Sequence, residues 1–424
     1  MSENPLFSFI HCADLHLDSP FEGIHAVEPD IATILRDATF KAFDNVIDHA
    51  VRECADFLII AGDVYDGADR SLRAQLRFRE ELRRAVENNI QCFLIHGNHD
   101  PLSGWEAGLT MPEGVYRFGG EKVNRIVAKR GSEELAHIYG FSYPVREVRE
   151  NLVSRFQREG GAPFAIGVLH CNVGGDPNHD NYAPCALDDL GTRGMDYWAL
   201  GHIHAKKVLS QHGPCIVYSG NTQGRSLKEL GPRGCYHVCV DETGLIRAQF
   251  LATDVVRWFA EEVNITGLNS IDELVDRLYR VREDVRSYAE GRGAILRMQL
   301  VGRGDLHTKL RRVEPDRDLT LPLREGEIDR SDFVWVDSVI VTTRPTIDIP
   351  QRSLVEDFIG DFLRAAQTVR NHPNPGGTIR ELFMSRPEHR VILEQIAQLS
   401  EPDLLSTIDE AEVLGLNQLL GEEE

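Results

Sequence analysis

The sequence predicts an α/β fold in which buried parallel strands alternate with helices. Five short apolar runs, each closed by glycine or polar residues, have the length and composition of strands buried on both faces. Apolar residues recur at i, i+3 and i+4 in residues 35–54 and 73–89, which predicts two amphipathic helices between the early runs. This strand–helix–strand alternation implies parallel pairing, and parallel sheets form their sites at the carboxyl ends of strands.

The first predicted strand leads to a carboxylate and an imidazole. In "FSFIHCADLHLDSP", residues 7–20, an apolar run ends shortly before Asp14 and His16. Residues two apart in an extended segment point the same way, so both side chains would aim at one point. One such pair is a weak signal, because an aspartate that caps a turn beside a surface histidine would produce the same D-x-H motif. Partners elsewhere in the chain decide between these interpretations.

Four further predicted strands end in residues of the same chemistry. Their sequences are "DFLIIAGDVYD", "IQCFLIHGNHD", "PFAIGVLHCN" and "MDYWALGHIHA". The candidate ligands at their ends are Asp63, Asn98, His170, His202 and His204, with His99 and Asp100 beside them. Since five strand ends of this kind are very improbable by chance, we predict that these residues form one site with Asp14 and His16.

The donor types predict a pair of divalent metal ions. Oxygen and imidazole ligands without thiolate suit Mn²⁺, Fe²⁺ or Zn²⁺ better than Cu⁺ or an iron–sulfur cluster. The ligands are too many for one ion and suit two ions if one carboxylate bridges them. Asp63, in a tight Gly-Asp turn, is the natural bridge. Cys12 and Cys171 neighbour candidate ligands, and we interpret them as small buried hydrophobic residues. His179, in the loop after His170, is expected to line the cleft.

Composition bounds the class of protein. A chain of 424 residues predicts two or three domains. It has no apolar run long enough for a bilayer crossing and no signal segment, and its eight cysteines form no C-x-x-C pair, so a reducing cytoplasm is expected. The net charge of −21 disfavours a protein that holds nucleic acid by itself, because phosphate contacts require basic surface.

The order D-x-H, G-D, G-N-H-D, a lone strand-end histidine and G-H-x-H resembles the calcineurin-like metallophosphoesterases, over about residues 1–250. The resemblance implies a four-layer αββα sandwich with a dinuclear metal centre, expected to hold Mn²⁺. It also implies that His99 is the non-ligand proton donor and that Asp100 orients it. The implied ligands of one metal are Asp14, His16, Asp63 and His204, and those of the other are Asp63, Asn98, His170 and His202.

Within that family, "HCADLHLDSP" and the long C-terminal extension resemble the SbcD-type DNA-repair nuclease subunits. "YSGNTQGRSLKELGPRGCYHV", "NYAPCALDDL" and "VWVDSVIVTTRP" resemble the bacterial YhaO-like branch. Archaeal and eukaryotic relatives place a histidine three residues after the bridging aspartate, where this chain has Asp66. The candidate substrate contacts are Asp66, His179, Asn221 and Arg225.

We expect three domains, with the phosphoesterase in residues 1–254. Residues 255–347 are expected to form a small α+β unit that resembles the capping domain of SbcD-type nucleases. There, Ser270 and Glu273 form a capping box before an amphipathic helix, and "ILRMQLVGRG" and "DFVWVDSVIVTTRP" have the pattern of strands. Residues 348–424 are expected to form a helical, acidic extension.

The C-terminal extension predicts a docking surface for another protein. Ser353 and Glu356 form a second capping box before a helical pattern that ends at Arg370. Residues 389–420 are leucine-rich, with no lysine or arginine after Arg390, so exposed apolar stripes are expected there rather than a nucleic-acid contact. In the family that this chain resembles, the partner is a coiled-coil ATPase of the structural-maintenance-of-chromosomes kind.

Three functions fit these patterns. The leading interpretation is a manganese-dependent DNA nuclease, a 3'–5' exonuclease with single-strand endonuclease activity, that acts in DNA repair with the ATPase, as a monomer or homodimer and without a membrane. The alternative is a phosphodiesterase or phosphatase for a nucleotide or another small phosphate ester, which the acidic charge favours mildly. A scaffold with a vestigial metal site is the third, and the intact ligand set disfavours it.

Overall fold

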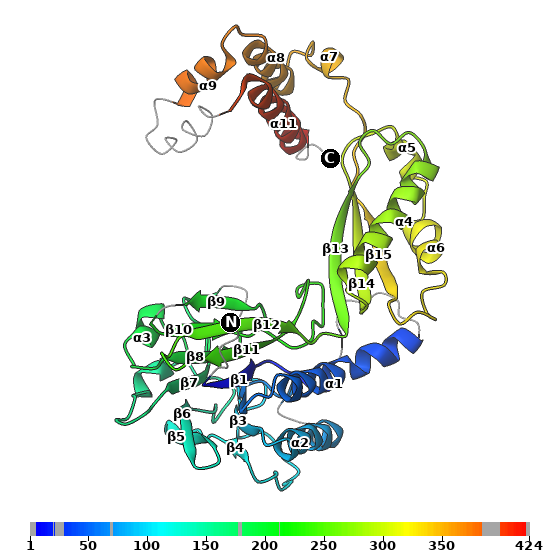
Figure 1. Ribbon diagram of the computed structural model, residues 1–424. Coiled ribbons are helices and arrows are strands. Elements are labelled where there is room, and N and C mark those ends of the chain that lie inside the picture. Colours follow the sequence, from blue (N-terminus) through cyan, green and yellow to red (C-terminus); the bar gives the residue numbers. More distant parts are fainter. Residues whose placement is uncertain are drawn as a thin grey trace. The chain divides into compact units, whose positions relative to one another are not determined.

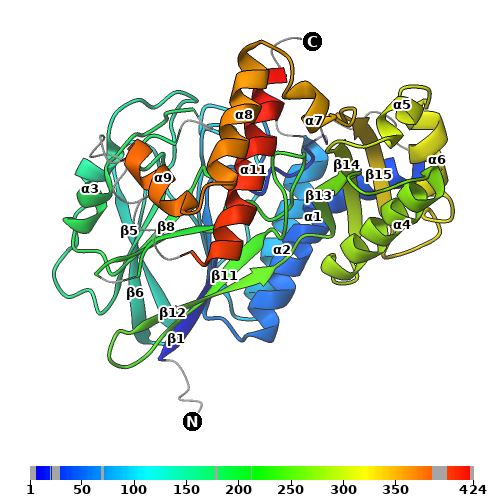
Figure 2. The same ribbon diagram turned by 90° about the horizontal axis from the view of Figure 1, so that it is seen from above.

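The computed structural model describes residues 6–19, 21, 29–67, 71–176, 180–211, 213–383 and 399–420. The chain divides into two compact units, and most of their elements are labelled in Figure 1 and Figure 2. Unit 1 comprises Met1–Ile265, Ser270–Val301 and Arg312–Thr342, and unit 2 comprises Thr266–Asn269, Gly302–Arg311 and Thr343–Glu424. Among the described residues, no helix is both long enough and apolar enough to span a bilayer.

Unit 1 begins with a six-stranded sheet in the order β12-β11-β1-β2-β3-β4. Its strands are β1 (Phe7–Cys12), β2 (Phe57–Ala61), β3 (Gln91–Ile95), β4 (Val115–Arg117), β11 (Gly234–Val240) and β12 (Ile246–Ala252). β1, β2 and β3 are parallel, as the strand–helix alternation predicts, and β4 is parallel to β3, whereas β11 runs antiparallel to both of its neighbours, β1 and β12. Both predicted helices form, as α1 (Pro29–Arg52) and α2 (Leu72–Glu87), and they pack on one face of this sheet (Figure 1).

A second six-stranded sheet has the order β5-β6-β7-β8-β10-β9. Its strands are β5 (Asn124–Arg130), β6 (Glu133–Gly140), β7 (Ala165–His170), β8 (Tyr197–Gly201), β9 (Lys207–Ser210) and β10 (Cys215–Tyr218). The short helices α3 (Leu187–Gly191) and η1 (Leu152–Arg155, a 3-10 helix) contribute to the apolar cluster on its outer face.

The core lies between the two sheets. Along β2, Phe57 and Ile59 face the second sheet, while Leu58 and Ile60 face α1 and α2. Side chains alternate in this way because successive residues of a strand point to opposite faces. Both faces of the central strands are therefore buried, which is why these strands read as continuous apolar runs. The predicted αββα sandwich is confirmed.

A small sheet of three parallel strands completes unit 1. Its elements are β13 (Val256–Asn264), α4 (Ile271–Tyr288), β14 (Gly293–Val301), η2 (Pro315–Thr320), α6 (Leu321–Arg324) and β15 (Val334–Val341). The hydroxyl of Ser270 accepts a hydrogen bond from the backbone N–H of Glu273 at 3.2 Å, so the predicted helix start is confirmed. The predicted strands form β14 and β15, and the structure adds β13.

Trp258 of β13 anchors the loop that follows β10. Its side chain is fully buried in an apolar cluster with Ile31 and Leu35 of α1. The indole Nε1 donates to the backbone oxygen of Gly224 at 2.9 Å, and Gln223 Nε2 donates to the backbone oxygen of Val256 at 2.6 Å. These bonds fix a segment that bears candidate site residues.

Unit 2 is helical, with α5 (Leu306–Leu310), α7 (Ile349–Arg352), α8 (Phe358–Arg370), α9 (Pro375–Phe383) and α11 (Glu401–Leu420). The predicted capping box at Ser353 and Glu356 is wrong. The carboxylate of Asp357 caps α8 by accepting from the N–H of Gly360, while the Ser353 hydroxyl donates to the backbone oxygen of Pro350 at the end of α7.

The expected exposed stripe on the terminal helix needs correction. Leu404, Ile408 and Leu416 of α11 are buried, and Leu416 joins a cluster with Ile359 and Leu363 of α8. A helix pair within one chain therefore uses part of the apolar surface that was expected to be free. Residues 389–398 lie outside the described residues.

Candidate metal centre

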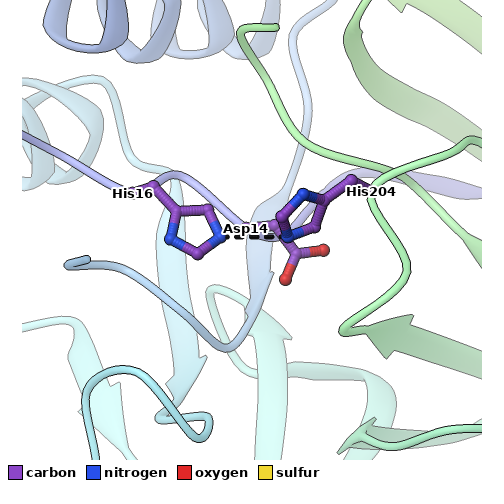
Figure 3. Close-up of side chains that lie close together, drawn as sticks. All are labelled: Asp14, His16 and His204. Carbon is purple, nitrogen blue, oxygen red and sulfur yellow. Dashed lines mark hydrogen bonds between the residues drawn. The ribbon is translucent and has the colours of Figure 1, made fainter. Parts of the chain in front are cut away.

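Donors from both sheets converge where their central strands end. The predicted ligands lie after β1 (Asp14, His16), after β2 (Asp63), after β3 (Asn98), at the end of β7 (His170) and after β8 (His202, His204). Asp14, His16 and His204 form one group whose potential ligand atoms lie within 4.8 Å of one another, and Asp14, Asp63 and His170 form a second. Figure 3 shows the first group, with one residue pair from the loop after β1 and His204 from the loop after β8.

The remaining predicted donors lie against these groups. Asn98 Oδ1 is 3.0 Å from His170 Nε2, and the backbone N–H of His202 donates to Asp14 Oδ1 at 3.0 Å. The structure thus brings all seven candidate ligands together, although they come from segments far apart in the sequence. Six of them are almost fully buried, and the side chain of His204 is 19% exposed.

The backbone of these loops is locally strained. Four of the candidate ligands have positive φ angles, Asp14 (52°), His16 (44°), Asp63 (48°) and His202 (98°). A residue with a side chain adopts this region at a cost, and such residues concentrate at functional sites. Hydrogen bonds between the loops hold the conformation, because the N–H of Asp14 donates to the oxygen of Gly62 and that of His16 to the oxygen of Asp63.

The motif glycines let these loops approach one another. A Cβ on Gly97 would lie 2.3 Å from Asp63 Oδ1, and one on Gly201 would lie 2.0 Å from the oxygen of Ala61. Gly62 combines a φ of +97° with a contact of 2.4 Å between such a Cβ and His170 Nδ1. The glycines of G-D, G-N-H-D and G-H-x-H are therefore required for packing around the site.

Asp63 and His170 form a buried charged pair. His170 Nε2 lies 3.3 Å from Asp63 Oδ2. Burial alone would lower the pKa of His170, but the neighbouring charge and hydrogen bond of Asp63 outweigh it and raise this pKa to about 9. Burial likewise opposes ionisation of Asp63, yet His170 holds the pKa of that carboxyl well below its usual range. For Asp14, burial prevails and raises the pKa. The two side chains of Asp63 and His170 therefore favour each other's charged forms within a buried site.

His16 and His204 face each other through the same ring nitrogen. Their Nε2 atoms are 3.2 Å apart (Figure 3). His204 Nδ1 donates to Glu229 Oε1 at 2.6 Å, and His16 Nδ1 lies 2.9 Å from Asp66 Oδ1. With a proton on each Nδ1, both Nε2 atoms present lone pairs to one another. Burial, together with the nearby charge of Arg225, lowers the pKa of His16 to about 3, which favours this neutral form.

These features fit divalent metal binding. Opposed lone pairs repel unless a cation lies between them, and the neutral imidazole is the form that binds metal. The complete set comprises two carboxylates, one amide and four imidazoles, without a thiolate. Hard and borderline divalent ions prefer such donors. The residues present therefore fit divalent ions, with the donor atoms of Asp14, His16 and His204 close enough to share one ion and those of Asp14, Asp63 and His170 close enough to share another.

His99 lies beside this centre, and its expected partner needs correction. Asp100 accepts from the N–H groups of Val64 and Gly97 and lies 2.8 Å from His96 Nδ1, so it fixes the loop rather than His99.

The contacts of the His99 ring are with Asp66 and His16. His99 Nδ1 lies 3.4 Å from the backbone oxygen of Asp66 and 3.5 Å from its Oδ1, and the ring meets that of His16 edge to face. The His99 N–H donates to Asp63 Oδ1 at 3.0 Å. The side chain is 35% exposed, so it can reach both the centre and solvent.

The predicted substrate contacts lie in different places. Asp66 and Arg225 lie at the edge of the centre, joined by a 2.9 Å ion pair. Asn221 is 1% exposed, and its Oδ1 accepts from Arg233 Nη1 at 3.2 Å, so the structure places it inside its loop. His179 lies outside the described residues.

Sequence reasoning missed two residues, Glu229 and Ser19. Glu229 partners His204, which outweighs the effect of burial and lowers the pKa of Glu229 to about 2. Ser19 donates to Asp66 Oδ2 at 2.8 Å. Both lie close to motif residues in the sequence, but no spacing rule links either to a ligand. A carboxylate four residues after Arg225 was the available signal.

Comparison with known proteins places the chain among phosphoesterases. The family described as calcineurin-like phosphoesterase matches residues 7–206, and the family described as metallophosphoesterase YhaO, middle domain, matches residues 258–344. The chain is 40% identical over 331 residues to the uncharacterized metallophosphoesterase YhaO of Bacillus subtilis, covering 77% of this chain and 80% of that protein. It is also similar to proteins named DNA double-strand break repair protein Mre11. The one from Aeropyrum pernix is 26% identical, covering 53% of this chain and 56% of that protein, and the one from Thermoplasma acidophilum is 30% identical, covering 45% and 52%.

Proposed function

The chain belongs to the calcineurin-like phosphoesterase family, and from this premise we propose that it is a manganese-dependent DNA nuclease. Membership makes the chain a hydrolase of phosphoester bonds, in a family that uses a dinuclear divalent metal centre. The observation that carries this function is the convergence of seven oxygen and imidazole donors at the ends of strands from both sheets. The choice of DNA as substrate is supported by the likeness to proteins named for double-strand break repair.

The chemistry divides between the ions and the chain. When bound, two divalent ions would supply positive charge that attracts the phosphate, and they would lower the pKa of a bound water towards neutral pH. The chain's carboxylates and imidazoles fix the positions of those charges, and burial of the donors strengthens their electrostatic effect. His99 would donate a proton from Nε2 to the leaving oxygen, since Nδ1 contacts Asp66. We propose 3'–5' exonuclease and single-strand endonuclease action.

We propose a coiled-coil ATPase as partner in DNA repair. The net charge of −21 opposes the approach of a polyanion, so a second protein with basic surface would bring DNA to the site. Residues 389–420 are the proposed docking segment. A reducing cytoplasm suits the eight free cysteines of the chain, and we place the reaction there.

A direct assay separates the candidate substrates. The full chain is incubated with end-labelled single- and double-stranded DNA and, in parallel, with a chromogenic phosphodiester, each with Mn²⁺ or Mg²⁺. We expect shortened DNA products with Mn²⁺, and no products from Asp63→Ala, because that substitution removes the carboxylate shared by both ion sites. Intact DNA beside rapid turnover of the small diester, both without and with the co-expressed ATPase, would overturn the nuclease proposal.

The second candidate is a phosphodiesterase or phosphatase for a nucleotide or another small phosphate ester. The acidic charge favours it, because a small ester needs no basic track for a nucleic-acid backbone. The same assay decides, since this enzyme would cleave the chromogenic diester or release phosphate from nucleotides while leaving DNA uncut.

A further inference from the structure

The four imidazoles of the centre differ in what holds their second nitrogen. His204 Nδ1 donates to Glu229 Oε1 at 2.6 Å, and His16 Nδ1 lies 2.9 Å from Asp66 Oδ1. In contrast, two imidazoles contact neutral backbone oxygens: His170 Nδ1 that of Ala61 at 3.0 Å and His202 Nε2 that of Asp180 at 2.7 Å. Carboxylates thus support the imidazoles of one ion site and carbonyls support those of the other.

One arginine joins the two supporting carboxylates. Arg225 Nη1 donates to Asp66 Oδ1 at 2.9 Å, and the backbone N–H of Arg225 donates to Glu229 Oε2 at 2.6 Å. The hydroxyl of Ser19 adds a bond to Asp66 Oδ2 at 2.8 Å and accepts one from Arg225 Nη1. The side chains of Arg225 and Glu229 are 15% and 10% exposed. We call Asp66, Arg225 and Glu229 the support network.

The support network stands on a fixed loop. Trp258 holds the oxygen of Gly224 directly before Arg225, and Arg233 Nη1 donates to the backbone oxygen of His204. Neighbouring elements therefore fix the loop that carries Arg225 and Glu229.

We propose that the support network makes the ion held by Asp14, His16 and His204 the more tightly bound of the two. A carboxylate partner makes an imidazole more basic and fixes its orientation, and loss of such a partner costs roughly 10–100-fold in metal affinity. The hydrogen bond of His204 to the ionised Glu229 is also stronger than one to a neutral carbonyl. The inference deepens the proposed function, because it rests on a dinuclear centre.

The proposal changes the roles of two residues. Asp66 and Arg225 were candidates for substrate contacts, and here they are positioning residues that act through His16 and Glu229. Asp66 stands where archaeal and eukaryotic relatives are expected to carry a histidine. In this chain its carboxylate lies between the rings of His16 and His99, at 2.9 Å and 3.5 Å from their Nδ1 atoms.

Metal binding without substrate tests the proposal. Mn²⁺ is titrated into the full chain by calorimetry, for the wild type, Glu229→Gln and Asp66→Asn, each of which removes charge and keeps size. We expect each variant to weaken one ion by about 10–100-fold and to leave the affinity of the other unchanged. Glu242→Gln, an exposed carboxylate in the turn between β11 and β12, is the control and should bind both ions as the wild type does.

Single-site backgrounds identify which ion responds. Asn98→Ala removes a ligand of one site, and Glu229→Gln in that background should weaken the remaining ion. His204→Ala removes the supported site, and Glu229→Gln in that background should change nothing. Circular dichroism confirms that each chain is folded, and Asp66→Asn replaces Glu229→Gln if the latter is not.

Two results would overturn the proposal: equal weakening of both ions, or no weakening of either. The outcome is independent of the substrate, because no DNA is present. A chain that leaves DNA uncut but shows the selective loss would support the network and refute the nuclease proposal.

Discussion

The contacts and exposure of His99 fit a proton donor rather than a metal ligand. Its ring is half-exposed, contacts Asp66 through Nδ1 and lies beside, not among, the seven candidate ligands. We predict that His99→Ala keeps both ions and lowers kcat by about 10²–10⁴-fold, the usual loss for a general acid. Metal content by elemental analysis and turnover of a chromogenic phosphodiester check this together.

A different result would reassign His99. His16, Asp66 and His99 also lie close enough to form a metal site of their own. If His99→Ala loses an ion along with its activity, His99 is a ligand and the proton comes from another group.

At the residue scale, the sequence motifs predicted the candidate metal ligands but not the residues that contact those ligands. D-x-H, G-D and G-H-x-H are short motifs that directly follow predicted strands, so they could be recognised from the sequence alone. Glu229 reaches His204 across 25 positions, and Asp66 reaches His16 across 50, through loops whose path depends on tertiary packing. The expected link from Asp100 to His99 failed for the same reason, because Asp100 bonds the His96 ring and two backbone N–H groups.

At the scale of elements, the strands buried on both faces were the feature that the sequence predicted best. Each central strand appears as an apolar run because one set of side chains faces the second sheet and the other faces the helices. Helix starts depended on local chemistry. Ser270 caps α4 as predicted, whereas Asp357 caps α8 in place of Ser353, because a short helix, α7, ends at Arg352.

The terminal helix α11 provides a prediction about the partner. Leu404, Ile408 and Leu416 are buried, whereas Leu414 is 61% exposed. We predict that Leu414→Asp weakens co-purification with a co-expressed coiled-coil ATPase and leaves hydrolysis of a small phosphodiester unchanged. Leu245→Asp is the matched control, since Leu245 is 58% exposed in the turn between β11 and β12 of unit 1. Unchanged complex formation by Leu414→Asp would contradict docking through this residue.

At the scale of the whole molecule, charge limits what the chain does alone. With a net charge of −21, we predict that the isolated chain binds duplex DNA weakly and with few phosphate contacts. A plot of log affinity against log salt concentration should therefore have a shallow slope, which steepens when the ATPase is added. Fluorescence anisotropy with labelled duplex measures both slopes. Tight binding by the chain alone, with a steep slope, would contradict this prediction and would show that the chain has a basic DNA-binding surface of its own.

The central claim is that strand ends of two packed sheets build a centre for two divalent ions. The most direct measurement is metal content by mass spectrometry of the full chain at equilibrium with excess Mn²⁺, with the metal of the protein-free buffer subtracted, beside Asp63→Ala treated in the same way. Because seven donors converge, and Asp63 Oδ2 lies 3.9 Å from His16 Nε2 and 3.3 Å from His170 Nε2, we predict two ions per wild-type chain and loss of most metal from the variant. One ion or none in the folded wild-type chain, or a variant that retains both, would contradict the account.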